Sequence, residues 1–380
     1  MEFSFTDEQK MVIKEAKRFA EERLAPDVEE LDQKGEVNLT ALKELGELGY
    51  LGITVPEKYG GVDMGVVVYA GTMLELSKVD AGTAVAVSVH NSLVNEGILK
   101  FGTEKQKEEY LPKLTSGDWM SCFSLSEANA GSDPGALQTS AVRKGDSFIL
   151  NGTKNFTSSG DFADLIIVFA QTDKDKGSRG ISAFILKNDT PGFSIGKREN
   201  KMGIRSASCT ELVFDECEIP ADSLLGKENG GLKIALTLLD GGRIGIAAQA
   251  VGIAEAALEE AIRYSKERVQ FKKSLSKFQA IQFMLAEMAT EVELAKTMLY
   301  KVAWLKESGK KDFSKEAAML KLYASEMSHR VCHKALQIHG GYGYMKEYKI
   351  ERLYRDQRIT EIYEGTSEIQ KVVIARKILQ

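Results

Sequence analysis

Glu364 is an acidic side chain at a position that suits a general base. It lies in the segment 362–370, where Ser367 and Gln370 have the spacing of a capping box and predict the start of the last helix. The helix dipole would stabilise the carboxylate as an anion. An apolar ligand packed over it would desolvate it and raise its pKa toward that of a useful base. From the residues alone, a solvated loop acid is the favoured interpretation of Glu364.

Two short segments combine glycine with hydroxyl side chains and are candidates for holding a planar polar cofactor. They span residues 126–133 and 155–160, and both lie at the ends of predicted strands or between them. Glycine lets backbone amides approach a ligand closely, and hydroxyls can donate to ring heteroatoms or phosphates. Simple turns have the same composition, so the residues alone leave both interpretations open.

A third segment, residues 337–344, ends a predicted helix with Gly340 and Gly341. A plain helix C-cap would explain the glycine pair. His339 beside them could act as a base, but a histidine at this position is also typical of a capping or packing residue.

Composition and motifs exclude several classes of function. The formal net charge is −5 and no run of five or more Lys or Arg occurs, which disfavours nucleic acid as a partner. No GxGxxG follows a predicted strand and no GxxxxGK[ST] occurs, so neither a Rossmann nor a P-loop site is predicted. The 4 cysteines form no CxxC pair, and the histidines lack partners at zinc-finger spacing, so no metal site is expected.

Residues 1–20 alternate charged and apolar positions. They lack both the apolar core of a signal peptide and the run of about 20 apolar residues that a membrane helix needs. We therefore expect no membrane span and a cytoplasmic location.

The chain is predicted to be an α+β protein of several domains, because single cores stop growing near about 250–300 residues and this chain has 380. Thr6 and Gln9 form a capping-box pattern, and helical periodicity continues to about residue 118. Residues 1–118 are expected to form an N-terminal α-helical domain. Its further predicted helices are 42–48, 67–78, 92–101 and 104–114.

Residues 119–225 are rich in short β-type runs separated by turn pairs such as Asn151-Gly152. Because no helical pattern lies between these runs, they favour an antiparallel β-barrel or sandwich over a parallel sheet. The predicted strands are 121–126, 147–151, 164–171, 180–187, 193–197 and 209–214.

Helical patterns return for residues 226–380 and predict a bundle. An apolar stripe runs from Ile281 to Leu305, and another helix is expected over residues 314–340. The stripe is most simply the core of the bundle, and a contact between subunits is the second interpretation.

Several motifs in the same order make the chain similar to the acyl-CoA dehydrogenase family, and most similar to its short-chain, butyryl-CoA members. The resemblance extends to Gln380 and implies an α-helical domain, a β-barrel domain and a C-terminal four-helix bundle. This is the order that the helical and strand patterns predict independently. The motifs are Glu127-Ala-Asn-Ala-Gly-Ser-Asp133, Lys201-Met-Gly-Ile-Arg205, Thr210-Glu-Leu-Val-Phe214, Arg268 to Gln279, Gln337-Ile-His-Gly-Gly341 and Tyr363-Glu-Gly-Thr-Ser367.

The resemblance implies FAD as cofactor, held between the middle and C-terminal domains and across a subunit contact of a homotetramer, a dimer of dimers. The residues implied to line the isoalloxazine are Phe123, Leu125, Ser126, Phe156 and Ser158, with Thr366 and Ser367 completing the pocket. Those implied to contact the pyrophosphate and adenosine, partly from the neighbouring subunit, are Arg268, Phe271, Gln279, Gln337, Ile338, His339, Gly340 and Gly341. An arginine at such a site suits a diphosphate.

The implied reaction is the α,β-dehydrogenation of an acyl-CoA to the trans-2-enoyl-CoA. Glu364 would take the α-proton while a β-hydride passes to flavin N5, and an electron-transferring flavoprotein would receive the electrons. The backbone N–H of Glu364 would polarise the thioester carbonyl, and Gly365 would keep that backbone uncovered. The pantetheine and nucleotide portions would face Ser132, Leu239, Asp240 and Arg243.

Departures from the family pattern concern the outer edge of the flavin and the turn that clamps it. Phe156 replaces a common tryptophan, Lys272-Lys273 replaces Gly-Lys or Gly-Pro, and Ala128 replaces a proline. Gly242 occupies the position from which some members supply their glutamate, which leaves Glu364 as the candidate base.

The helix over residues 90–102 is similar to that of short-chain members, which favours butyryl-CoA or another short substrate. Branched, cyclic or aryl-substituted acyl-CoA thioesters are alternatives. A second hypothesis is a relative that carries out desulfination, decarboxylation or oxygen-coupled oxidation. A third is a non-catalytic binding or assembly protein with the same fold. Glu364 favours the dehydrogenase.

Overall fold

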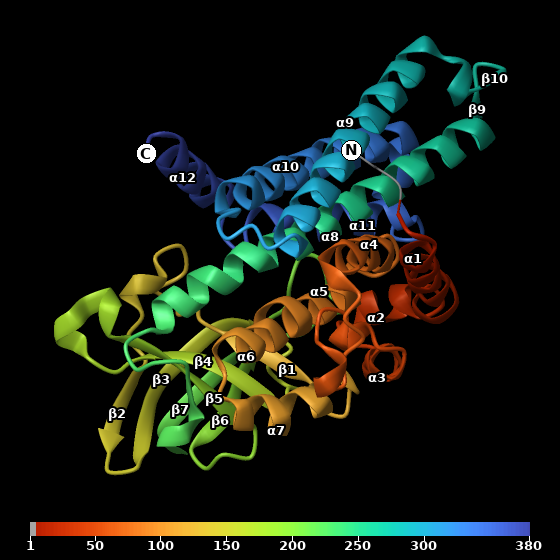
Figure 1. Cartoon of the computed structure of the whole chain (residues 1–380). Helices are drawn as coiled ribbons and strands as arrows, with labels where there is room; N and C mark the ends of the chain where they lie inside the picture. Colours follow the sequence, from red (N-terminus) through yellow and green to blue (C-terminus); the bar gives the residue numbers. More distant parts are fainter. Residues whose placement is uncertain (1–4) are drawn as a thin grey trace.

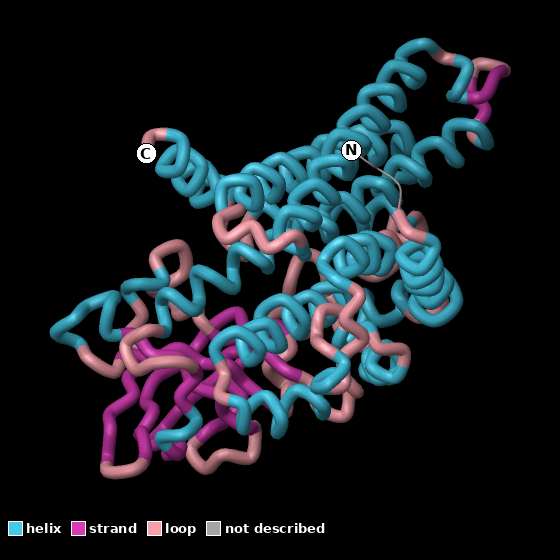
Figure 2. The backbone as a smooth tube through the Cα atoms, viewed as in Figure 1, coloured by secondary structure: helices cyan, strands magenta, loops and turns pink. Residues whose placement is uncertain are grey.

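The computed structural model describes residues 5–380 and shows helices, then a β-sheet, then helices again along the chain (Figure 1). The strands of the sheet gather on one side of the molecule, with helices around them (Figure 2). The predicted order of helical, sheet and helical regions is confirmed. The N-terminal helices are α1 (Asp7–Phe19), α2 (Val28–Lys34), α3 (Leu39–Glu47), α4 (Gly65–Ser77), α5 (Ala81–Val89), α6 (Glu96–Phe101) and α7 (Glu104–Thr115).

Local signals set the ends of some N-terminal helices and fail for others. Thr6 caps α1 through the predicted capping box, since its side chain accepts from the backbone of Gln9 and the Gln9 side chain accepts in return. The helix predicted over residues 92–101 instead begins at Ala81 and runs through a π-helical turn at His90–Asn95. Every residue of α5 is buried, so its sequence carries no amphipathic period that could have revealed it.

The middle region forms a sheet with the order β6-β7-β3-β2-β4-β5-β8 and with β1 paired to β4. Most neighbours are antiparallel as predicted, but β4 pairs in parallel with β1 and with β2. Strand β2 was missed, because its five residues are mostly polar and exposed and give no apolar alternation. The strands are β1 (Ser121–Ser124), β2 (Ser140–Lys144), β3 (Ser147–Ser158), β4 (Leu165–Gln171), β5 (Ile181–Lys187), β6 (Phe193–Arg198), β7 (Cys209–Pro220) and β8 (Leu224–Leu225).

The C-terminal region is built around α8, which packs against α9, α10 and the N-terminal α4. By length and composition α8 could cross a membrane, but 78% of its most apolar window is buried inside the fold, as expected for a central core helix. The apolar stripe of α9 faces this core through Met288, Val292 and Leu299. The elements are α8 (Gly231–Glu267), β9 (Val269–Gln270), β10 (Lys273–Ser274), α9 (Gln279–Glu307), α10 (Ser314–His339), α11 (Lys349–Gln357) and α12 (Ser367–Ile378).

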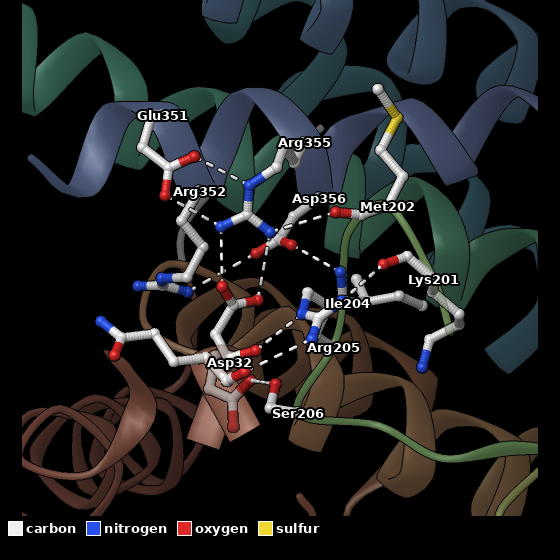
Figure 3. Close-up of polar contacts among 12 residues, drawn as sticks. Asp32, Lys201, Met202, Ile204, Arg205, Ser206, Glu351, Arg352, Arg355 and Asp356 are labelled. Atoms are coloured by element: carbon white, nitrogen blue, oxygen red, sulfur yellow. Dashed lines mark hydrogen bonds and ion pairs between the residues drawn. The ribbon is translucent and has the colours of Figure 1, made fainter. Parts of the chain in front are cut away.

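Arg355 of α11 lies where all three regions of the chain meet (Figure 3). Its guanidinium contacts both carboxylate oxygens of Asp32 in α2, at 2.7 and 3.2 Å, and donates to the carbonyl of Met202 at 3.1 Å. Next to it, Asp356 accepts the backbone N–H of Ile204 at 2.5 Å. We call this set of contacts the Arg355 junction.

The Arg355 junction explains the Lys201–Arg205 motif as a contact between domains. A side chain at Gly203 would overlap the backbone carbonyl of Arg355, so only glycine allows this close approach. A cavity of about 560 Å³ opens beside the junction, and its walls contain none of the predicted site residues. The junction therefore fixes α11, and α11 leads directly along the chain to Glu364.

We predict that Asp32→Asn lowers the free energy of unfolding by about 2 kcal/mol, because it removes one of the two carboxylates that pair with the partly buried Arg355 guanidinium and leaves only Glu351. Urea denaturation measures the loss. Asp222→Asn is the matched control: it breaks the 3.0 Å contact with Lys105, which also joins two regions but is solvent-exposed. That change is expected to cost less than about 1 kcal/mol. Equal effects of the two substitutions would contradict a special role for the junction.

Candidate active site

Glu364 lies in a left-handed turn directly before α12. Its φ is 51° and that of Gly365 is 91°, so a non-glycine residue occupies a conformation that costs about 1 kcal/mol or more. The helix begins at Ser367 as predicted, but its cap is Thr366, whose side chain accepts the N–H of Ile369 at 3.3 Å. The predicted capping box of Ser367 with Gln370 is therefore wrong by one residue.

Gln370 has a different task from the predicted one. Its side-chain amide donates to the carbonyls of Glu364 at 3.1 Å and Gly365 at 2.8 Å. These two bonds satisfy backbone acceptors of the turn and hold its left-handed conformation. The side-chain hydroxyl of Tyr363 donates to Gln249 of α8, which anchors the same turn from the other side.

The Glu364 carboxyl is turned toward the interior. The residue as a whole is half-buried, while its Oε2 is buried and has no hydrogen-bond partner among the described residues. This oxygen lies against the bare backbone of Gly242 in α8, because a Cβ built on Gly242 would overlap it. Burial raises the pKa of Glu364 to about 7, against the opposing charges of Arg243 and Lys321. Glu364 is therefore not a solvated loop acid.

The cations near Glu364 come from two helices of the bundle. Arg243 of α8 is buried and forms a 2.5 Å ion pair with Asp240. Lys321 of α10 is fully buried and donates to the carbonyl of Gly365 at 2.7 Å. Arg243 and Asp240 are among the residues predicted from the sequence, whereas Lys321 is not, because a lysine within a helical pattern is typical of a solvent-exposed position.

The two glycine- and hydroxyl-rich segments lie side by side where β1 and β3 end, and residues 155–158 are the last residues of β3, which extends beyond the predicted strand 147–151. The N–H of Asn155 donates to the carbonyl of Ser126 at 2.9 Å, and the hydroxyls of Ser124 and Thr157 are 2.7 Å apart. The residues predicted to line the flavin, which come from these segments and from β1 and the residue after it, are thus brought together. They are Phe123, Leu125, Ser126, Phe156 and Ser158.

A buried ion pair that the sequence analysis did not identify locks these segments. Lys154 contacts Glu127 at 2.7 Å and donates to the carbonyl of Leu125 at 3.1 Å. Glu127 also accepts the N–H groups of Gln138 and Thr139. Burial lowers the pKa of Lys154 to about 8, against the opposing charge of Glu127. The pair gives the surface carrying the exposed Phe156 ring a fixed shape.

The residues predicted to contact the pyrophosphate and adenosine form a separate group at the far end of the bundle, beside β9 and β10 (Figure 1). The Arg268 guanidinium lies over the Tyr342 ring at 5.2 Å, and His339 stacks on Tyr264. His339 is buried and bonded to a backbone carbonyl of its own helix, which fits the packing interpretation rather than that of a base. Phe271 at the tip is 86% exposed. The remaining members of the group are Gln279, Gln337, Ile338, Gly340 and Gly341.

The predicted substrate residues come from two regions of the chain, the loop after β1 and the helix α8. Ser132 is exposed in the loop after β1, whereas Leu239 and Asp240 are half-buried on α8, next to the seat of Glu364 at Gly242. Gly365 follows the base in the turn, and Thr366 and Ser367 begin α12 beside it.

Comparison with known proteins matches the whole described fold to one family. Residues 6–118 match the domain described as acyl-CoA dehydrogenase, N-terminal domain, residues 122–217 the middle domain, and residues 229–379 the C-terminal domain. The chain belongs to the acyl-CoA dehydrogenase family, whose curated relatives are FAD-dependent oxidoreductases.

Individual relatives are similar over their full length. The chain is 47% identical to a short-chain-specific acyl-CoA dehydrogenase of Clostridium acetobutylicum, covering 100% of both proteins. The structure of butyryl-CoA dehydrogenase from Megasphaera elsdenii superimposes with a TM-score of 0.98 at 48% identity, again over 100% of both chains. A chain in a structure described as the electron transferring flavoprotein of Acidaminococcus fermentans gives 0.99 at 49% identity, with 100% coverage of both chains.

We predict that Gly242→Ala lowers turnover by about 100-fold, because the new methyl group must displace the Glu364 carboxyl from its seat. Steady-state kinetics measures the loss, and the flavin content should not change. Lys43→Ala, an exposed substitution on α3, is the control variant and should keep the turnover of the parent protein. Full activity of Gly242→Ala would show that the carboxyl does not act from this position.

Proposed function

We propose that this protein catalyses the flavin-dependent α,β-dehydrogenation of an acyl-CoA, with Glu364 as the catalytic base. The observation that carries the proposal is the Glu364 carboxyl: one oxygen is buried without a hydrogen-bond partner, and its pKa is raised to about 7. A carboxylate whose pKa lies near the working pH is an effective general base.

The turn around Glu364 does two things for this reaction. Its left-handed backbone aims the carboxyl inward, where an acyl thioester can shield it from water. Gly365 leaves the neighbouring backbone without a side chain, so the N–H of Glu364 can donate to the thioester carbonyl as negative charge develops there. Ser132, Leu239, Asp240 and Arg243 would bind the remainder of the thioester.

The predicted flavin-lining residues, which lie where β1 and β3 end, fit an isoalloxazine ring. An exposed Phe156 ring, a half-buried Phe123 and the hydroxyls of Ser126 and Ser158 present apolar surface and hydrogen-bonding groups on one rigid support. Unpartnered buried hydroxyls at Ser208, Thr210 and Ser367 could donate to such a ligand. FAD, when bound, would supply the acceptor for the β-hydride.

We further propose a homotetramer in which a neighbouring subunit completes the FAD site. Within one chain, the end of the bundle that carries β9 and β10 lies far from the sheet (Figure 1), and exposed apolar side chains such as Phe283, Leu294 and Trp304 lie along α9. Both features suit a second copy that brings its β9–β10 tip to the flavin. Domain boundaries at residues 118/119 and 225/226 belong to the same proposal.

A short acyl chain, a cytoplasmic location without a membrane span, and an electron-transferring flavoprotein as electron acceptor complete the proposal. Support for the substrate comes from the similarity to short-chain and butyryl-CoA enzymes. Support for the acceptor comes from the similarity to a chain in an electron transferring flavoprotein structure. The buried position of α8 supports the absence of a membrane span.

Anaerobic addition of a panel of saturated acyl-CoA thioesters tests the function. We expect butyryl-CoA to bleach the oxidised flavin faster than longer or branched thioesters. Glu364→Gln should slow bleaching by about 1,000-fold or more while FAD stays bound. Glu368→Gln, an exposed acid four residues away, should bleach within about twofold of the parent protein. No bleaching by any saturated acyl-CoA would reject the proposal.

The rate of bleaching should fall as the pH drops below about 7, because the raised pKa of Glu364 leaves the carboxyl protonated there. The base form, and with it kcat/KM, is expected to fall about tenfold per pH unit on the acid side and to level off above pH 8. Stopped-flow rates at low substrate concentration measure this profile. A flat profile between about pH 5.5 and 8 would show that no group with this pKa removes the proton.

A further inference from the structure

Lys321 is a fully buried ammonium group on α10 that faces the turn of the proposed base. Its Nζ donates to the carbonyl of Gly365 at 2.7 Å. Within residues 5–380 this is its one hydrogen bond, and no carboxylate oxygen lies within 4.0 Å of it. Burying an ammonium group with a single neutral acceptor lowers the stability of the fold. Stability therefore does not explain a lysine at this position.

The hydrogen bond alone does not explain why this position is a lysine. Gln370 donates to the same Gly365 oxygen at 2.8 Å, so the backbone acceptor already has a neutral partner. What Lys321 adds is a positive charge. The charge lies beside a turn whose carboxyl has one oxygen without any partner.

The two cations near Glu364 differ in how much of their charge reaches it. Arg243 forms a 2.5 Å ion pair with Asp240, which offsets its charge. Lys321 has no such counterion. Arg243 acts more strongly on the Glu364 carboxylate, but Lys321 is the one of the two cations whose charge no carboxylate within 4.0 Å offsets.

We infer that Lys321 is the positioning residue for proton removal: its unpaired charge favours the ionised form of Glu364, and its hydrogen bond to Gly365 helps Gln370 to hold the left-handed turn that aims the carboxyl. This inference rests on the proposed function of Glu364. Without Lys321, the Glu364 carboxyl would be protonated over a wider pH range and would remove the proton more slowly.

The groups that face this pair are few. Burial lowers the pKa of Lys321 to about 8, against the opposing charge of Glu364, so the ammonium is charged at neutral pH. The other titratable groups around Glu364 and Lys321 are Arg243 of α8, Tyr69 of α4, Tyr363 of the turn itself, and Glu361 and Glu368 on either side of it. Burial raises the pKa of both tyrosines, which keeps them neutral in this range.

Lys321→Met tests the inference in the FAD-loaded protein. Removing the cation raises the pKa of Glu364, so the acid limb of kcat/KM should move to higher pH by about one unit. At pH 7 the rate should fall about fivefold, because the ionised fraction of Glu364 drops from about one half to about one tenth, and most of the rate should return at higher pH. Lys321→Arg, which keeps the charge, should stay closer to the parent profile. Ser325→Ala, a buried change one turn along the same helix, is the matched control and should leave the profile in place.

A second readout does not depend on turnover. Infrared spectra at pH 7 should show a stronger protonated-carboxyl band in Lys321→Met than in the parent, and the additional band should disappear when Glu364→Gln is combined with it. If Lys321→Met does not fold, Lys321→Gln, which retains a donor for Gly365, is expected to show the same shift.

The outcomes separate the two proposals. A uniform loss of rate with an unmoved acid limb and an unchanged carboxyl band would overturn the inference and leave Lys321 a packing residue. Bleaching that survives Glu364→Gln would instead reject the proposed base, whatever Lys321→Met does.

Discussion

The close contact between the Glu364 carboxyl and the bare backbone of Gly242 is the constraint on which the rest of the site depends. A carboxyl can occupy that space because α8 presents no side chain there, and it can reach the space because the turn before α12 is left-handed. Each condition has its own support. Gln370 and Lys321 hold the carbonyls of the turn, and the buried environment raises the pKa of the acid.

The Arg355 junction shows how a site of this kind is kept in register across three structural regions. Its contacts join α2, the loop at residues 202–205 and α11. Because α11 precedes the Glu364 turn in the chain, movement of one region against another would be transmitted to the base. Bidentate pairing gives the junction direction as well as strength, which single-point contacts would not. The motif at Lys201–Arg205 contributes to this junction through Met202, Gly203 and Ile204.

The separation of the two groups of proposed FAD contacts has a physical origin. One group lies where β1 and β3 end, beside the Lys154–Glu127 ion pair, and the other lies at the end of the long helices α8 and α10. Because these helices are long, residues that are predicted to bind the same cofactor lie far apart within one chain. A site made from both groups requires two copies, as the proposed assembly provides.

The sequence by itself determined the order of helical and sheet regions and the cap at Thr6, because these follow from periodicity and local hydrogen bonding. Glu364 was selected through the order of the family motifs, and its residue pattern alone favours a solvated loop acid. It did not reveal α5, whose uniform burial removes the amphipathic signal, nor β2, whose polar residues give no alternation. The tertiary structure alone decided that Lys154 and Lys321 are buried beside the proposed cofactor and base. Burial and pairing of a lysine depend on side chains distant in the sequence, and local pattern carries no record of them.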